Sequence, residues 1–181
     1  EETAALPGGG MTALRALRHG KVQKGQHVLI YGASGAVGTY AVQLARHFGA
    51  EVTGVCSTRN LELIRALGAA TAIDYTQEDY TKRGETYDVV IDAVGMLASE
   101  QAQQVLRPSG LYVNVHNVPG SESLDDLVLL KELAEAAIVR PVIDCKVTRI
   151  NIHTSSDVKQ LSKGFVQLDN KWCIVLLVCV R

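Results

Sequence analysis

The chain has 181 residues, of which 47% are apolar and 20% charged, so it can bury a sizeable core and is not a disordered chain. Its net charge is −1 and it contains no basic block, which gives a nucleic-acid-binding surface no electrostatic support. The four cysteines are scattered without a C-x-x-C pair. This pattern argues against a zinc site or a disulfide framework and suits a reducing cytosol.

Neither end of the sequence carries a membrane signal. The apolar run at 173–180, CIVLLVCV, is far shorter than the ~20 residues that cross a bilayer. The opening residues, EETAALPGGG, lack the basic and apolar regions of a signal peptide. We therefore expect a cytoplasmic protein that binds neither membranes nor nucleic acid.

Short apolar strands alternate with amphipathic helices along most of the chain. Strands are predicted at Val28–Tyr31, Glu51–Cys56, Ala70–Asp74, Tyr87–Asp92 and Leu111–Val115. Helices are predicted at Val37–Phe48, Asn60–Ala69, Ala98–Leu106 and Leu124–Ala137. The segment after the last helix, 138–144, is expected to be extended because Pro141 interrupts a helix.

This alternation predicts an α/β fold built from right-handed βαβ units. We expect a Rossmann-type, doubly wound parallel sheet of about six strands with helices on both faces. Residues 1–25 would form a hinge segment with a helix, and residues 26–144 the dinucleotide-binding domain. The tail at 145–181 would hold one helix and one strand.

A glycine-rich turn, GASGAVG, joins the first predicted strand to the first long helix. It places Gly32, Gly35 and Gly38 at intervals of three. Such a turn lets the backbone approach a pyrophosphate, which then meets the free N–H groups and the positive end of the helix. A purely structural strand-to-helix turn is the alternative. The chain has no P-loop motif and no Tyr-x-x-x-Lys pair, so nucleotide hydrolysis and short-chain dehydrogenase chemistry are not supported.

The residues after the second strand favour NADPH over NADH. An NAD site usually carries an acid there for the ribose hydroxyl, whereas this strand ends in Cys56 and is followed by Ser57, Thr58, Arg59 and Asn60. A guanidinium and neighbouring hydroxyls can bind a 2′-phosphate. In the alternative interpretation, a hydroxyl caps the next helix and Arg59 is solvated.

Read together, these motifs resemble the medium-chain dehydrogenase/reductase superfamily, in its quinone-oxidoreductase-like branch. The resemblance rests on AALPGGGMTALRAL, VLIYGASGAVGTYAVQLAR, ALGA followed by AIDY, and YDVVIDAVG, in that order. It covers about residues 4–144 and implies an NADPH-dependent oxidoreductase. The hydride would pass directly from cofactor to a quinone or an activated double bond, so no catalytic residue and no metal are expected.

The resemblance also implies a line of cofactor-binding residues. At the pyrophosphate they are Gly32, Ser34, Gly35, Ala36, Val37 and Gly38. At the 2′-phosphate and adenine they are Ser57, Arg59, Asn60 and Tyr75. At the nicotinamide half they are Val94, Gly95, Asn114, Val115 and Thr12.

Several of these residues have an equally ordinary interpretation. Tyr75 could be a half-buried aromatic residue at a strand end, and Thr12 a plain helix residue. His116 reads better as a solvated loop histidine than as a functional one. Asp92 reads better as an acceptor of turn N–H groups than as a base.

The sequence departs from the family pattern in three places. The catalytic domain that precedes the hinge in relatives is absent, so the substrate would be presented by a domain outside this chain. The stretch between LYVNV and LDDLV is short, although many relatives carry there a strand that pairs across a homodimer, which leaves a homodimer as an open expectation. The tail matches the closing strand of the family only loosely.

Three function hypotheses follow. The first is the cofactor-binding part of an NADPH-dependent quinone or enone reductase, inactive as this chain alone. The second is an isolated nucleotide-binding module that binds NADPH without turnover. The third is a methyltransferase-type Rossmann protein, which would require an acid after the second strand.

Overall fold

The computed structural model describes residues 6–120, 123–142, 165–168 and 171–174. Its centre is a parallel five-stranded sheet in the order β3-β2-β1-β4-β5. The strands are β1 (His27–Tyr31), β2 (Glu51–Cys56), β3 (Thr71–Asp74), β4 (Tyr87–Asp92) and β5 (Leu106–Asn114). The predicted α/β, Rossmann-type architecture is confirmed, with five strands in this sheet rather than about six.

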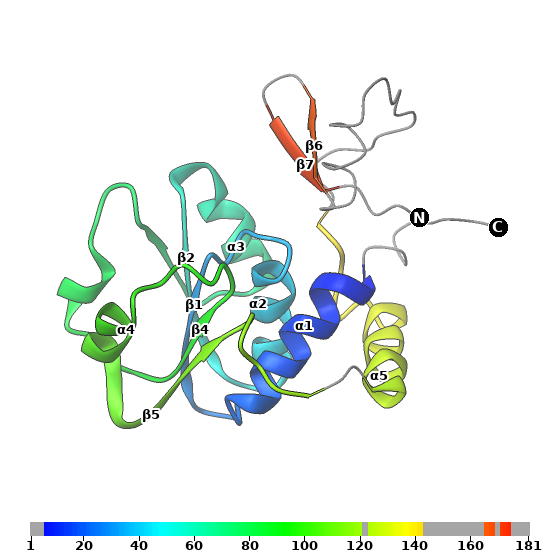
Figure 1. Ribbon diagram of the computed structural model, residues 1–181, viewed down its shortest axis with the longest axis horizontal. Coiled ribbons are helices and arrows are strands. Elements are labelled where there is room, and N and C mark those ends of the chain that lie inside the picture. Colours follow the sequence, from blue (N-terminus) through cyan, green and yellow to red (C-terminus); the bar gives the residue numbers. More distant parts are fainter. Residues whose placement is uncertain (1–5, 121–122, 143–164, 169–170, 175–181) are drawn as a thin grey trace.

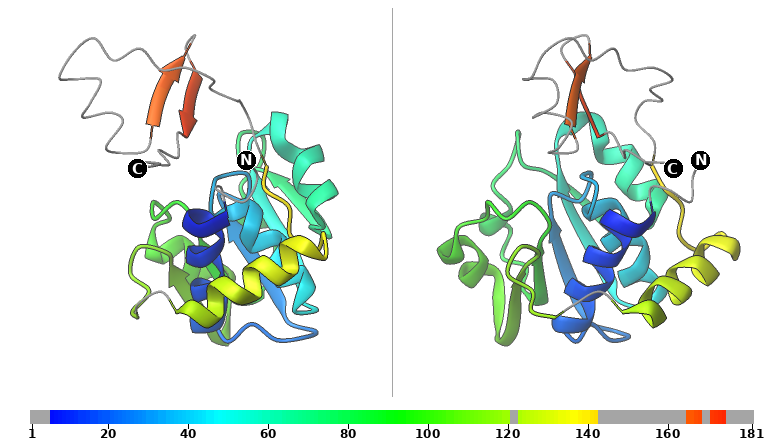
Figure 2. Two further views of the ribbon diagram at one scale, coloured as in Figure 1. Left: turned by 90° about the vertical axis from the view of Figure 1, so that its right-hand side faces the viewer. Right: turned by 45° about the vertical axis from the view of Figure 1, so that its right-hand side comes forward.

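Helices cover both faces of the sheet (Figure 1). They are α1 (Leu6–His19), α2 (Gly38–His47), α3 (Leu61–Leu67), α4 (Ser99–Val105) and α5 (Leu124–Glu135), with 3-10 turns η2 (Thr58–Asn60) and η3 (Tyr80–Arg83). Helices α1, α2, α3 and α5 share one core with the sheet, whereas α4 and η3 pack on the opposite face. Helix α5 lies across α1 on the outside of its layer (Figure 2), where Arg18 of α1 pairs with the buried Asp126 of α5.

Side chains alternate along each strand, so neighbouring residues point into different cores. In β1, Val28 and Ile30 face the layer of α1 and α2, whereas Leu29 faces α4 and η3. All three are fully buried, as expected for a parallel sheet covered on both sides. The near-continuous apolar runs read from the sequence are a direct consequence of this double burial.

The sheet reverses its winding direction between β1 and β4. The chain passes from β1 outward through β2 to β3, and then returns to place β4 on the other side of β1. The loops after β1 and β4 lead to helices on opposite faces, which makes this point the topological switch of the sheet. In sheets of this kind, ligands bind at that point.

Helix ends follow the glycine signals. Gly68 caps α3 in the left-handed conformation, with φ of +108°. Gly49, just after α2, has φ of +81° and therefore also favours glycine. Strand β5 begins five residues earlier than Leu111, at Leu106, and a register irregularity separates the two parts of its pairing with β4.

The segment after α5 does not form a strand among the described residues up to Val142. A side chain of α2 binds its backbone instead. Gln43 accepts a hydrogen bond from the Arg140 N–H (2.8 Å) and donates one to the Arg140 carbonyl (2.9 Å). This pairing satisfies both backbone polar groups of Arg140, and residues 143–144 lie outside the described part.

In the tail, the described residues form β6 (Phe165–Leu168) and β7 (Lys171–Ile174), an antiparallel pair that makes its own sheet. The sequence predicted one helix and one strand there. The rest of the tail lies outside the described residues, and the domain boundaries at 25 and 144 remain predictions. Among the described residues, no helix combines the length and the apolar character needed to cross a membrane.

Gly38 is expected to be intolerant of any side chain. A Cβ at this position would overlap the Gly32 carbonyl and the Ala33 backbone, which cannot move aside as a flexible side chain could. Gly38→Ala should lower the free energy of unfolding by about 1–3 kcal/mol in urea denaturation. Gly8→Ala is the matched control, because a Cβ there meets nothing within 4 Å, and it should cause no loss. Equal stability of both variants would contradict the close packing of α2 on the turn.

Asp88 is expected to make stability sensitive to acid. Burial raises its pKa, but hydrogen bonds from the His27 N–H (2.8 Å) and the Arg107 guanidinium (2.6 Å) outweigh burial and hold the pKa below its ordinary value. The stabilisation is therefore present above about pH 4, the pKa in the unfolded chain, and is lost as the pH falls through the folded pKa.

Asp88→Asn should reduce the free energy of unfolding at pH 7 by about 1–2 kcal/mol, because it weakens two charge-assisted hydrogen bonds. Urea titrations at pH 7 and pH 3 should show a smaller loss on acidification in the variant than in the parent. An unchanged loss would mean that other carboxylates carry the acid sensitivity.

Candidate functional site

The glycine turn folds tightly against the end of β2. The N–H groups of Gly32 and Ala33 both donate to the Val55 carbonyl, at 3.1 and 3.0 Å. Gly32 has φ of +75°, and the Gly35 N–H closes the turn on the Gly32 carbonyl at 3.0 Å. A Cβ on Gly35 would meet only that carbonyl, at 3.3 Å, so the outer side of the turn is open.

Helix α2 begins directly after this turn without a side-chain cap. Its N-cap residue is Val37, and its first turn contains no acidic residue. The positive end of the helix dipole is therefore not neutralised from within the helix. Helix α1 crosses close by, since a Cβ on Gly9 would overlap the Ala36 carbonyl. Such a helix start can hold an anion.

Three predicted residues meet at the carboxyl ends of β1 and β2. The Asn60 amide donates to the Ser34 hydroxyl at 2.9 Å and lies 3.3 Å from the Ser57 hydroxyl. Asn60 thus joins the glycine turn to η2. Arg59, in the middle of η2, is exposed and has no hydrogen bond or ion pair with any described residue. The arrangement is two hydroxyls and an amide joined by hydrogen bonds, next in sequence to an exposed arginine that has no partner within the described part of the chain.

The sequence interpretation missed Asp74. This residue ends β3 and lies directly beside Cys56 in the sheet register. Its carboxylate accepts hydrogen bonds from the Thr58 hydroxyl, the Thr76 hydroxyl (2.7 Å) and the Thr76 N–H (2.9 Å). The Thr58 hydrogen bond, the largest cause, and the Thr76 bonds hold its pKa below the ordinary value against a smaller effect of burial. The Asp-x-Thr spacing in IDYT was the available signal, but only the tertiary fold adds Thr58.

Asp92 organises the loop after β4. Its fully buried carboxylate accepts from the N–H groups of Val94 (3.1 Å), Gly95 (2.8 Å) and Leu97 (2.9 Å), and from the Tyr112 hydroxyl (3.1 Å). The expectation that Asp92 accepts turn N–H groups is confirmed. A carboxylate committed to four donors is a structural anchor rather than a base.

That loop brings the predicted nicotinamide-end residues against the glycine turn. A Cβ on Gly32 would overlap the Val94 side chain, and one on Gly95 would overlap the His116 ring. Asn114 is close by, because its side-chain oxygen accepts the His116 N–H at 2.9 Å. His116 is exposed, and its Nε2 lies 3.1 Å from the Val94 carbonyl. Gly32, Val94, Gly95 and Asn114 therefore form one continuous surface.

Three other predicted residues are placed differently. The side chain of Val115 is buried in the core, so only its backbone could meet a ligand. The Thr12 hydroxyl donates to the Gly8 carbonyl (2.9 Å) within its own helix. Tyr75 stands beside the end of β2, where its N–H donates to the Cys56 carbonyl, and 55% of its surface is exposed.

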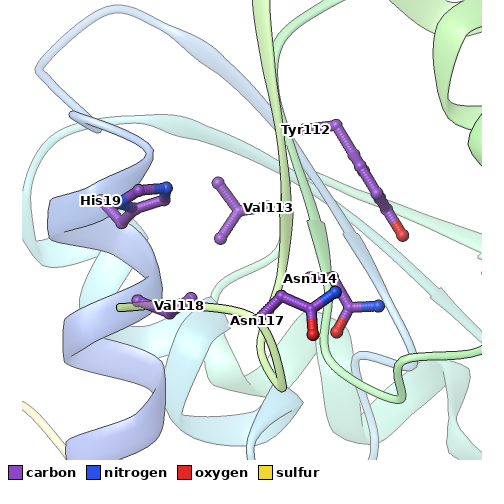
Figure 3. Close-up of a pocket in the computed structure, with 6 residues that line it drawn as sticks. All are labelled: His19, Tyr112, Val113, Asn114, Asn117 and Val118. Carbon is purple, nitrogen blue, oxygen red and sulfur yellow. The ribbon is translucent and has the colours of Figure 1, made fainter. Parts of the chain in front are cut away.

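A small pocket of about 220 Å³ opens beside the edge strand β5 (Figure 3). It is lined by His19 from α1 and by Tyr112, Val113, Asn114, Asn117 and Val118 from β5 and the turn after it. Drug-sized ligands occupy ~300–1,000 Å³, so this pocket alone does not hold a dinucleotide. It shares Asn114 with the surface described above.

Among the described residues, no group of three or more His, Cys, Asp or Glu side chains is arranged to hold a metal ion. We assign no residue to zinc. The residues predicted to bind the cofactor fit a dinucleotide, because the outer side of the glycine turn is open at Gly35 and the helix start beside it carries no acid.

Comparison with known proteins places the chain in a family. The zinc-binding dehydrogenase family matches residues 36–141, more than half of the chain. A 2-methylene-furan-3-one reductase from Solanum lycopersicum is 37% identical over 155 residues, covering 80% of this chain and 39% of the relative. An NADPH-dependent alkenal/one oxidoreductase, chloroplastic, from Arabidopsis thaliana is 36% identical, covering 80% of this chain and 40% of the relative.

A solved structure agrees with the fold. The quinone oxidoreductase from Coxiella burnetii matches 77% of this chain and 50% of its own, with a TM-score of 0.71 and 31% identity. The chain thus spans about two fifths of the length of these two curated relatives. The chain belongs to the zinc-binding dehydrogenase family, and it corresponds to the cofactor-binding domain of the quinone-oxidoreductase-like branch of the medium-chain dehydrogenase/reductases.

Proposed function

We propose that this chain binds NADPH as the cofactor-binding part of an oxidoreductase that reduces a quinone or an activated enone. The observation that carries the proposal is the open glycine turn at the winding reversal of the sheet. A helix start without a side-chain cap follows it, and Arg59, which has no partner among the described residues, lies on the next turn. The names of the relatives support the reaction class, since they include an alkenal/one oxidoreductase described as NADPH-dependent.

The glycine turn would hold the pyrophosphate. The N–H groups of Ala36 and Val37 lie just before α2, where the helix dipole favours negative charge. Gly35 would leave room for the phosphates, while its own N–H closes the turn on the Gly32 carbonyl. Gly38 has a separate task, because it lets α2 pack against the turn at a distance that no side chain allows. The pyrophosphate is common to NADPH and NADH, so this part of the site gives affinity without choosing between them.

The turn after β2 would make the site selective for NADPH over NADH. Arg59 can grip a 2′-phosphate, and the hydroxyls of Ser34 and Ser57 stand beside it, joined through Asn60. No acid follows β2 until Glu62. Tyr75 would lie against the adenine or beside the phosphate, with an exposed ring that suits stacking.

The loops after β4 and β5 would hold the nicotinamide half. NADPH supplies a hydride when it is bound. Val94, Gly95 and the backbone at Val115 offer an apolar and backbone surface there, and the Asn114 amide offers hydrogen bonds. In the proposed complex these groups would orient the ring, and we assign none of them to proton transfer. Thr12 stays a weaker candidate, because its hydroxyl already donates within α1.

Partners and location are further parts of this proposal. The acceptor would be presented by a domain outside this chain, so we expect cofactor binding without turnover from the chain alone, and a homodimer remains an expectation. A cytoplasmic location also remains a prediction, since the Arabidopsis relative is named chloroplastic. Titration of the chain with NADPH and NADH, followed by nicotinamide fluorescence, tests the core of the proposal. Absent or equal binding of the two would overturn it.

Replacing Arg59 with Ala should weaken NADPH binding by roughly tenfold or more, because a charge-assisted contact to phosphate is worth ~1.5–3 kcal/mol. NADH affinity should change little. The measurement is the ratio of the two dissociation constants. Lys131→Ala, which removes an exposed positive charge from α5, is the control and should leave both constants unchanged. An unaffected ratio in Arg59→Ala would make Arg59 an ordinary surface residue.

Replacing Gly35 with Ala should weaken NADPH and NADH by similar factors, because the methyl group would stand where the backbone approaches the shared pyrophosphate. The fold should tolerate the change, since the nearest atom is the Gly32 carbonyl at 3.3 Å. Thermal unfolding would check the fold, and fluorescence titration the affinities. Unchanged affinity for both dinucleotides would place the pyrophosphate elsewhere.

A further inference from the structure

An acidic residue, Asp74, does lie near the expected ribose-binding position. It is on β3, whereas in an NAD site the acid follows β2. Asp74 on β3 pairs with Cys56 on β2, and Cys56 occupies the place where NAD-binding proteins of this architecture carry their acid. Asp74 is 6% exposed. The side chain is thus buried against the turn that carries Arg59.

Both oxygens of the Asp74 carboxylate accept hydrogen bonds from nearby threonines. One oxygen accepts the N–H and the hydroxyl of Thr76, at 2.9 and 2.7 Å, and the other accepts the hydroxyl of Thr58. The two threonine hydroxyls also lie 3.1 Å from each other. Thr58 is the first residue of η2, so this contact fixes the start of that turn to the end of β3.

The other end of η2 is fixed as well. Asn60, its last residue, donates to Ser34 in the glycine turn at 2.9 Å. A three-residue turn held at its first and third residues leaves its middle residue, Arg59, presented to solvent at a defined place. Holding the backbone in this way reduces the entropy lost when Arg59 binds a ligand.

The same hydrogen bonds keep Asp74 from forming an ion pair with Arg59, which would compete with phosphate binding. A free carboxylate on the neighbouring strand would be a natural partner for an unpaired guanidinium, because bidentate Arg–carboxylate pairs are strong. With both oxygens engaged by Thr58 and Thr76, no such pair forms in the described structure.

We propose that Asp74 is a positioning residue for NADPH selectivity: through Thr58 it anchors the turn that presents Arg59, and Thr58 in return keeps the carboxylate from pairing with Arg59. The inference rests on the proposed function, because it concerns the same 2′-phosphate site. Asp74 would then influence cofactor selectivity without contacting the cofactor, and it lies outside the segment that follows β2.

The test compares Thr58→Val with Thr58→Ser. Valine keeps the branched shape and removes the hydroxyl, whereas serine keeps the hydroxyl. The dissociation constants of NADPH and NADH are measured by nicotinamide fluorescence. Thr58→Val should reduce the preference for NADPH about fivefold or more, the equivalent of losing one hydrogen bond, with NADH affinity unchanged. Thr58→Ser should keep the preference of the parent chain.

Two further variants separate positioning from a general effect on the fold. Asp74→Asn can still accept from the Thr76 N–H and can donate to Thr58, and it should therefore keep the preference within about twofold. Thr81→Val is the matched control, because the Thr81 hydroxyl likewise donates to an aspartate, Asp79, at 2.6 Å in η3. It should leave the ratio unchanged, and thermal unfolding of all variants checks folding.

Each outcome bears on one of the two proposals. If the parent chain prefers NADPH and Thr58→Val keeps that preference, the role of Asp74 is overturned while the proposed function stands. A loss in Asp74→Asn as large as in Thr58→Val would also overturn it, since the hydrogen bonds would then not be the cause. If the parent chain shows no preference for NADPH, both proposals fall.

Discussion

The arrangement of the candidate site depends on one buried carboxylate. Asp92 is fully buried at the end of β4 and accepts hydrogen bonds from the loop N–H groups of Val94, Gly95 and Leu97 and from the Tyr112 hydroxyl of β5. A charge removed from water is tolerated only when such donors surround it, so the loop has little freedom to adopt another path. That path sets Val94 against Gly32 and Gly95 against His116, which joins the ends of three strands into one surface.

A second buried carboxylate organises the other end of the site by the same physics. Asp74 accepts hydrogen bonds from hydroxyls of η2 and of the turn after β3, and η2, held in this way, carries Arg59. The two acids lie at the carboxyl ends of β4 and β3, on either side of the glycine turn after β1. Between them, the turn and the start of α2 contribute no acidic group, so negative charge is confined to groups that are already hydrogen-bonded. The open surface that remains suits an anionic dinucleotide.

Much of the fold could be predicted because parallel strands buried on both faces read as short apolar runs, and glycines end the helices between them. Gly68 and Gly49 mark helix ends through their left-handed backbone, as the sequence suggested. After α5, the backbone of Arg140 is bonded from across the fold by Gln43, a polar residue inside an otherwise apolar helix pattern. No sequence pattern within residues 138–142 predicts the contact with Gln43. The sequence predicted which residues form the candidate site, but it did not predict the hydrogen bonds of Thr58 and Thr76 to Asp74.

The sequence by itself determined the element order, the glycine turn and the chemistry after β2, since these depend on local spacing and on residue type. The tertiary structure alone decided which residues meet. It placed Asp74 beside Cys56 through strand register, joined Asn60 to Ser34 across 26 residues, and buried Val115 in the core. Register and side-chain hydrogen bonds between distant strands arise only when the sheet is assembled, because no local pattern fixes them.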